Sequence, residues 1–166
     1  MLRLRPYKSC DADIIASWIT NEDIYLKWGG NLFGEYPLAG AIIDEVYTKK
    51  NGNCEEPDNF YPWVAVDDEN RVVGSFIMRY LHKDPKVLRF GWVIVDNSIR
   101  GRGYGRQMLE LGLKYAYEIL GVSVINLGVF EGNEIAHRCY QSVGFADREV
   151  VEKQPWNLIE MEHVRM

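Results

Sequence analysis

The sequence predicts a mixed α/β fold in which helices cover both faces of a central sheet. Strand-like segments alternate with amphipathic helical segments, and long hairpins precede the strand–helix units. The segment from Val87 to Val95 is almost continuously apolar, which is typical of a central strand that is covered on both sides. The chain has 166 residues and shows no linker, repeat or low-complexity tract, so we predict one domain over residues 1–166.

The composition indicates a globular protein and argues against several other classes. Hydrophobic residues make up 47% of the chain and aromatic residues 13%, which is too apolar for a disordered segment. The formal net charge of −5 argues against general nucleic-acid binding, which needs a basic face. The three cysteines are widely spaced and no histidine stands at ligand spacing, so we expect free thiols and no metal site. We expect a cytoplasmic protein, because there is neither a secretion signal nor an apolar run of transmembrane length.

The first 60 residues predict a short strand, two helices and a loop rich in aromatic residues. Leu2 to Arg5 alternates apolar and basic residues, as a half-exposed strand does. Ser9 can cap a helix whose Trp18 we assign to the core. From Asn21 onward, aromatic residues are interleaved with glycines, which predicts a mobile loop before a second helix from Leu38 to Lys49.

The remainder of the chain alternates strands with helices. Trp63–Val66 and Arg71–Tyr80 predict two strands that are joined by the polar turn at residues 67–70. A strand over Val87–Val95 comes next, followed by a helix that begins after the glycines at 101–105 and stops near Gly121. A strand over Val122–Phe130 then leads to a helix that Asn133 can cap and that ends at Gly144. The last elements are strand-like pieces near Val150 and over Leu158–Met161.

The turn after Val95 is a predicted anion-binding site. A helix N-terminus offers unpaired N–H groups and the positive end of the helix dipole, and glycines let the backbone approach a guest closely. The turn contains Gly101, Gly103 and Gly105 with Arg100, Arg102 and Arg106 around them, so the expected guest is a phosphate group. The P-loop pattern fails because Arg106 and Gln107 replace its Lys and Ser/Thr, and the dinucleotide fingerprint fails because Arg106 replaces its last glycine. A turn that the arginines merely solvate is the remaining alternative.

Two motifs in this order resemble those of the GNAT acetyltransferases (Gcn5-related N-acetyltransferases). Arg100-x-x-Gly103-x-Gly105, directly after a Val-Ile-Val strand, resembles motif A of the family. Asn133-x-x-Ala136-x-x-x-Tyr140-x-x-x-Gly144-Phe145 resembles the downstream motif, and the resemblance covers about Trp63 to Phe145. It implies a mixed, mostly antiparallel sheet in which two neighbouring parallel strands, here Val87–Val95 and Val122–Phe130, splay apart.

The resemblance implies an N-acetyltransferase that moves an acetyl group from acetyl-CoA to a primary amine by direct attack in a ternary complex. The pantetheine arm would lie between the splayed strands, a backbone N–H near residues 93–95 would polarise the carbonyl, and Tyr140 matches the family's general acid. The implied cofactor-binding residues are Val93, Ile94, Val95, Arg100, Gly101, Arg102, Gly103, Tyr104, Gly105, Arg106 and Asn133. No metal is implied.

The general base and the acceptor stay open. Arg89 stands where many family members carry a glutamate base, so Glu131, a carboxylate between Tyr36 and Asp58, or a chain of water could serve instead. Tyr140 could alternatively be a core tyrosine. Acidic residues crowd the loops between positions 22 and 58, so we predict a cationic primary amine, either a protein N-terminus or a small polyamine-like compound.

Two other functions compete with the enzyme. A non-catalytic acyl-CoA sensor would keep the binding turn without the chemistry, and a nucleotide-binding regulatory domain would use the same turn for ATP or NAD. The expected partners are acetyl-CoA and the amine acceptor, with a homodimer left open and neither nucleic acid nor a membrane expected.

Overall fold

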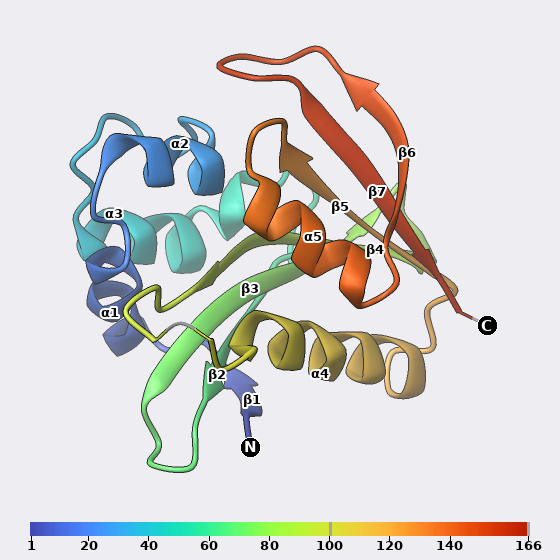
Figure 1. The fold of residues 1–166 in the computed structure, drawn as a ribbon, viewed down its shortest axis with the longest axis horizontal. Coiled ribbons are helices and arrows are strands. Elements are labelled where there is room, and N and C mark those ends of the chain that lie inside the picture. The colour runs from blue at the N-terminus through green and yellow to red at the C-terminus, as the bar shows by residue number, and fades with distance from the viewer. Residues whose placement is uncertain (100, 166) are drawn as a thin grey trace.

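The computed structural model, which describes residues 1–99 and 101–165, is built around a seven-stranded sheet with helices on both faces (Figure 1). The strand order is β1-β2-β3-β4-β5-β7-β6. Among the described residues, each neighbouring pair is antiparallel except β4 and β5, which are parallel. The strands are β1 (Arg3–Pro6), β2 (Tyr61–Val66), β3 (Val72–Leu81), β4 (Asp84–Val95), β5 (Val124–Phe130), β6 (Ala146–Val151) and β7 (Leu158–Val164). The predicted fold class is therefore confirmed.

The helices divide between the two faces of the sheet, and each face has its own core. Phe76, Phe90 and Leu127 pack with the helices α4 (Tyr104–Glu118) and α5 (Glu134–Ser142). On the other face, Ile77 packs with the N-terminal helices. These are α1 (Ala12–Ser17), α2 (Glu22–Gly29) and α3 (Gly40–Asp44), accompanied by the short helices η1 (Ser9–Asp11) and η3 (Asn51–Asn53) and by the π-helical turn η2 (Glu45–Lys49). None of the described helices is both long and apolar enough to cross a lipid bilayer.

The region that was predicted to be a mobile aromatic loop contains helix α2, so this prediction is wrong. Asn21 caps the helix, because its side chain accepts a hydrogen bond from the N–H of Ile24 (2.8 Å). Gly30 closes it in the left-handed conformation that glycine favours at a helix C-terminus. Tyr25 and Trp28 are buried, so the aromatic residues of this region belong to the core.

Two predicted helix caps are not made as expected. Ser9 is not a cap, since the carboxylate of Asp11 instead accepts a hydrogen bond from the N–H of Lys8 (2.8 Å) at the start of η1. Asn133 occupies the N-cap position of α5, but its side chain makes no capping hydrogen bond there. The amide of Asn133 is therefore not used by its own helix.

The parallel strands β4 and β5 pair only at their starts and then diverge. The paired residues are Val87 with Val124, Leu88 with Ile125, and Arg89 with Asn126. Beyond this point the two strands run on to Val95 and Phe130, and no pairing between them is described. This confirms the predicted pair of splayed strands.

Candidate active site

A cavity of about 720 Å³ lies where β4 and β5 diverge. Its wall includes the end of β4, the glycine turn, the start of α4, the middle of β5 and one side of α5. The predicted site residues that line it are Val93, Ile94, Val95, Gly101, Gly103, Tyr104, Gly105, Arg106, Asn133 and Tyr140. Arg102 is not part of the wall, and Arg100 lies outside the described residues. The fold thus brings the two sequence motifs together around one space.

The glycine turn and the start of α4 form an open end of this cavity. Gly101 and Gly103 have φ angles of +77° and +66°, which residues with a side chain rarely adopt. A Cβ atom built on either glycine would meet no atom of the described residues within 4 Å. No side chain caps the N-terminus of α4. Open space, glycine backbone and uncapped N–H groups together fit a phosphate-bearing guest.

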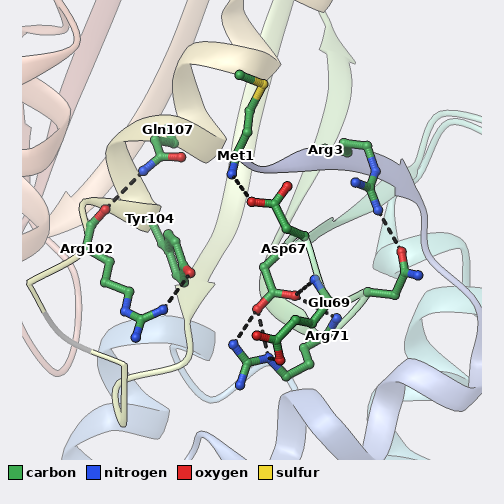
Figure 2. Close-up of polar contacts among 10 residues, drawn as sticks. Met1, Arg3, Asp67, Glu69, Arg71, Arg102, Tyr104 and Gln107 are labelled. Atoms are coloured by element: carbon green, nitrogen blue, oxygen red, sulfur yellow. Dashed lines mark hydrogen bonds and ion pairs between the residues drawn. The ribbon is translucent and has the colours of Figure 1, made fainter.

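The side chains at this turn hold its backbone in place (Figure 2). The amide of Gln107 donates a hydrogen bond to the backbone carbonyl of Arg102 (3.0 Å), which links the turn to the first turns of α4. The guanidinium of Arg102 lies 3.4 Å from the hydroxyl of Tyr104. Arg106 forms an exposed ion pair with Glu110 (2.9 Å). The side chains of Arg102 and Arg106 therefore lie on the surface around the open end.

β4 carries a bulge at the point where its neighbour has moved away. Its pairing with β3 joins Gly91 to Ile77 and then Ile94 to Ser75, so Trp92 and Val93 together oppose a single residue of β3. Trp92 has a φ angle of +44°, a conformation that is strained for a bulky residue. A bulge interrupts the ladder, so it can direct a backbone N–H away from β3 and toward the cavity.

Neighbouring side chains stabilise this bulge. The indole N–H of Trp28 donates a hydrogen bond to the backbone carbonyl of Trp92 (3.0 Å). The ring of Trp92 is stacked on Tyr47, with ring centroids 5.5 Å apart and planes 9° apart. Trp28 itself lines the cavity together with Ile24 and Lys27. Sequence reasoning missed these residues of α2, although the cap residue Asn21 and the glycines after Trp28 were available signals.

Tyr140 and Asn133 face the cavity from α5. Tyr140 is buried, with 6% of its surface exposed, and it packs edge-on against Phe145. Burial raises the pKa of its hydroxyl, so the phenol stays protonated at neutral pH. The side chain of Asn133 lines the same space without capping α5. Both residues are placed where a bound ligand could reach them.

Arg89, which stands where many members of the family carry a glutamate base, is a bound cation in this structure and cannot serve as that base. Its guanidinium binds Glu160 of β7 through two hydrogen bonds of 2.7 and 3.1 Å, and Asn126 of β5 through a third of 2.9 Å. Glu160 is thereby held by a cation. Glu131, a candidate base from the sequence, is exposed and does not line the cavity.

The acidic residues of the N-terminal loops also lie outside the cavity wall. Several of them have partners: Asp23 pairs with Lys27 (2.9 Å), and Asp44 accepts a hydrogen bond from the hydroxyl of Tyr7 (2.7 Å). The predicted cationic acceptor therefore stays a prediction. Within residues 1–99 and 101–165, no group of three or more His, Cys, Asp or Glu side chains is arranged to hold a metal ion.

The chain is similar to acetyltransferases, both at the level of protein families and among individual proteins. The acetyltransferase (GNAT) domain family matches residues 1–146. The chain is 28% identical over 145 residues to mycothiol acetyltransferase from Nocardiopsis dassonvillei, covering 81% of this chain and 43% of that protein. It is 32% identical over 116 residues to N-acetylaspartate synthetase from Xenopus tropicalis, covering 66% of this chain and 37% of that protein. The chain thus spans less than half the length of these relatives.

Solved structures share the fold over almost the whole chain. Spermidine N-acetyltransferase from Vibrio cholerae, in complex with CoA and spermine, superposes with a TM-score of 0.78 at 20% identity and covers 98% of this chain and 95% of its own. AAC(6')-Ib in complex with ribostamycin and coenzyme A superposes with a TM-score of 0.81 at 20% identity, covering 99% and 93%. At this level of identity the likeness shows the fold.

Proposed function

The chain belongs to the GNAT acetyltransferase family, and from that premise we propose that it moves an acetyl group from acetyl-CoA to a primary amine. The amine belongs to a small molecule or a protein N-terminus and attacks directly in a ternary complex. The observation that carries this proposal is the cavity between the diverging strands β4 and β5, which reaches the uncapped start of α4 and has Tyr140 in its wall. The named relatives, which include acetyltransferases of several acceptors, support the reaction class.

The glycine turn is proposed to hold the cofactor's pyrophosphate. Gly101 and Gly103 leave room for its oxygens, and the first N–H groups of α4 can donate hydrogen bonds to them. The side-chain amide of Asn133, which makes no capping hydrogen bond, can bind the pantetheine arm of the cofactor. When bound, acetyl-CoA supplies an acetyl group that is activated as a thioester.

The bulge in β4 is proposed to polarise the thioester carbonyl. Negative charge develops on this oxygen as the amine attacks, and a fixed N–H donor in a site with little water stabilises that charge. The bulge at Trp92 and Val93 lies in the cavity wall, and the hydrogen bond from Trp28 holds it in shape.

Tyr140 is proposed to donate a proton or a hydrogen bond to the leaving sulfur. A phenol has an unperturbed pKa of about 10 and a thiol one of about 8.5, so the phenol is protonated when the thiolate leaves. The incoming amine must be neutral to attack. Arg89 is a cation and Glu160 is paired with it, so we assign the removal of the amine's proton to a chain of water.

A turnover assay separates the enzyme from a non-catalytic sensor. The purified protein is incubated with acetyl-CoA and a panel of amines, and mass spectrometry detects the acetylated amine while a thiol reagent detects free CoA. We expect both products to appear together. Tight binding of acetyl-CoA by calorimetry with no product from any amine would instead identify a sensor, and displacement of CoA by ATP would identify a nucleotide-binding domain.

A further inference from the structure

The cavity between β4 and β5 passes through the sheet and reaches helix α2 on the other face. Tyr140, in its wall, belongs to the core beneath α4 and α5. Trp28, also in its wall, belongs to the core beneath the N-terminal helices. A space that both side chains border must run between the two strands, where no pairing is described beyond Arg89 and Asn126. The cavity therefore has a second end, away from the glycine turn.

This second end is where the acceptor's amine would arrive. The glycine turn is proposed to hold the pyrophosphate and the β4 bulge to polarise the carbonyl, so the reacting carbon lies beside the bulge. Trp28 of α2 donates its hydrogen bond to the carbonyl of Trp92 within that bulge (3.0 Å). An amine that attacks a carbon held there comes past α2, which contributes Ile24, Lys27 and Trp28 to the wall.

The described side chains at this end are apolar with one exception. Ile24 and Trp28 of α2 and Trp92 of β4 form an apolar surface, and the exception is the cation Lys27. Among the described residues, Asp96 is the one carboxylate anywhere in the cavity wall. It lies beside the glycine turn, roughly 10 Å further along the strand than Trp92, and it accepts hydrogen bonds from Ser98.

Lys27 is held in place by residues outside the cavity. Its ammonium lies 2.9 Å from the carboxylate of Asp23 and 5.9 Å from the ring centroid of Trp156, and neither of these residues lines the cavity. The ring of Trp156 in turn packs against Phe130 at the end of β5, with centroids 5.9 Å apart. Because the carboxylate of Asp23 is already used by Lys27, a bound acceptor meets the hydrocarbon stem and the positive charge of Lys27 and no free carboxylate.

We propose that the acceptor carries a single amine on an apolar, uncharged body, and that Lys27 excludes acceptors with a second positive charge. This inference rests on the proposed acetyl transfer, and it removes polyamines from the acceptors that the sequence suggests. The attacking amine loses its charge before it reacts, but a second ammonium would keep its own. That ammonium would have to leave water beside Lys27 without a carboxylate to pair with, which is costly. A carbon chain or ring instead gains from leaving water against Ile24, Trp28 and Trp92.

The first test compares two acceptors that differ only at the end remote from the reacting amine. The two molecules are n-hexylamine, which ends in a methyl group, and 1,5-diaminopentane, which has the same length and ends in a second ammonium. Purified wild-type protein is assayed with acetyl-CoA and each amine, and 2-phenylethylamine represents an aromatic body. Without discrimination the diamine would react up to about twice as fast, because either of its ends can react. We expect kcat/KM to be at least about tenfold higher for n-hexylamine, because an unpaired ammonium is costly to bury.

The second test changes the charge at position 27. Lys27→Glu places a carboxylate in the wall and should raise the ratio of kcat/KM for 1,5-diaminopentane to that for n-hexylamine by at least about tenfold. Lys27→Met removes the charge and keeps the stem, so this ratio should rise by about 3- to 10-fold. The KM for acetyl-CoA should stay the same in both variants. Lys49→Glu is the matched control, since Lys49 is exposed in η2 on the same face and does not line the cavity; it should leave the ratio unchanged.

Two results would overturn this inference while leaving acetyl transfer intact. One is a wild-type protein that prefers 1,5-diaminopentane to n-hexylamine. The other is a ratio that Lys27→Glu and Lys27→Met change no more than Lys49→Glu does. Absence of product from every amine, peptides with a free N-terminus included, would overturn the proposed function as well.

Discussion

The hydrogen bond from Trp28 to the backbone of β4 gives a direct test of how the bulge in this strand is maintained. The indole nitrogen of Trp28 lies 3.0 Å from the carbonyl oxygen of Trp92, and this contact ties α2 to the strand that lines the cavity. Trp28→Phe keeps an aromatic ring in the same buried place but removes the N–H donor. Trp92 would then hold its strained φ angle of +44° without this bond.

The expected loss of activity follows from the carbonyl oxygen of Trp92, which would be left without its hydrogen-bond donor. Removing one partner of a buried hydrogen bond costs about 1–3 kcal/mol, because the remaining group loses its compensation for leaving water. A backbone held in a sparsely populated region costs about 1–3 kcal/mol, so the lost bond is comparable with the strain that it offsets. If the bulge relaxes, the N–H that is proposed to polarise the carbonyl moves. We therefore expect kcat to fall by about 5- to 100-fold, since about 1.4 kcal/mol corresponds to a factor of ten.

A second tryptophan in the chain provides the control. The indole N–H of Trp63 is buried and has no hydrogen-bond partner among the described residues. Trp63→Phe therefore makes the same change in ring size without breaking a hydrogen bond. In urea unfolding, we expect Trp28→Phe to lose about 1–3 kcal/mol more of its free energy of unfolding than Trp63→Phe does. Equal losses in the two variants, with an unchanged kcat in Trp28→Phe, would refute the reasoning.

Three further outcomes are expected. Tyr140→Phe should lower turnover by at least about 100-fold with little change in acetyl-CoA affinity, because the ring stays and only the donor is lost; near-normal turnover would reduce Tyr140 to a packing residue. Gly103→Val should weaken acetyl-CoA binding in calorimetry while the protein remains folded by circular dichroism, and unchanged affinity would place the phosphates elsewhere. Gly112→Ala should destabilise the protein by about 1–3 kcal/mol, since the added Cβ would lie 2.8 Å from the ring of Phe76; a melting temperature equal to the wild type would contradict this.

The sequence predicts most of the sheet and the glycine turn before α4, because local patterns determine these parts. The apolar run from Val87 to Val95 and the glycines after it indicate a buried strand and a helix start within a single stretch of chain. Helix α2 is not predicted, because aromatic residues interleaved with glycines favour a loop; in the structure Asn21 and Gly30 cap this helix. The partner of Arg89 could not be predicted at all. Glu160 is 71 positions away and reaches Arg89 only because β7 pairs with β5.

The local and the distant determinants also lie on different faces of the sheet. The motif residues that suggest the cofactor, such as Gly103 and Tyr140, lie in the turn before α4 or in α5 and face one cavity. On the opposite face, Arg79 and Arg89 are partners in the pairing of β3 with β4, and Arg89 binds Glu160 from another part of the chain. Arg89, which stands where many members of the family carry a glutamate, is held by Glu160 and Asn126, so it joins β4 to β5 and β7 at the point where β4 and β5 begin to diverge.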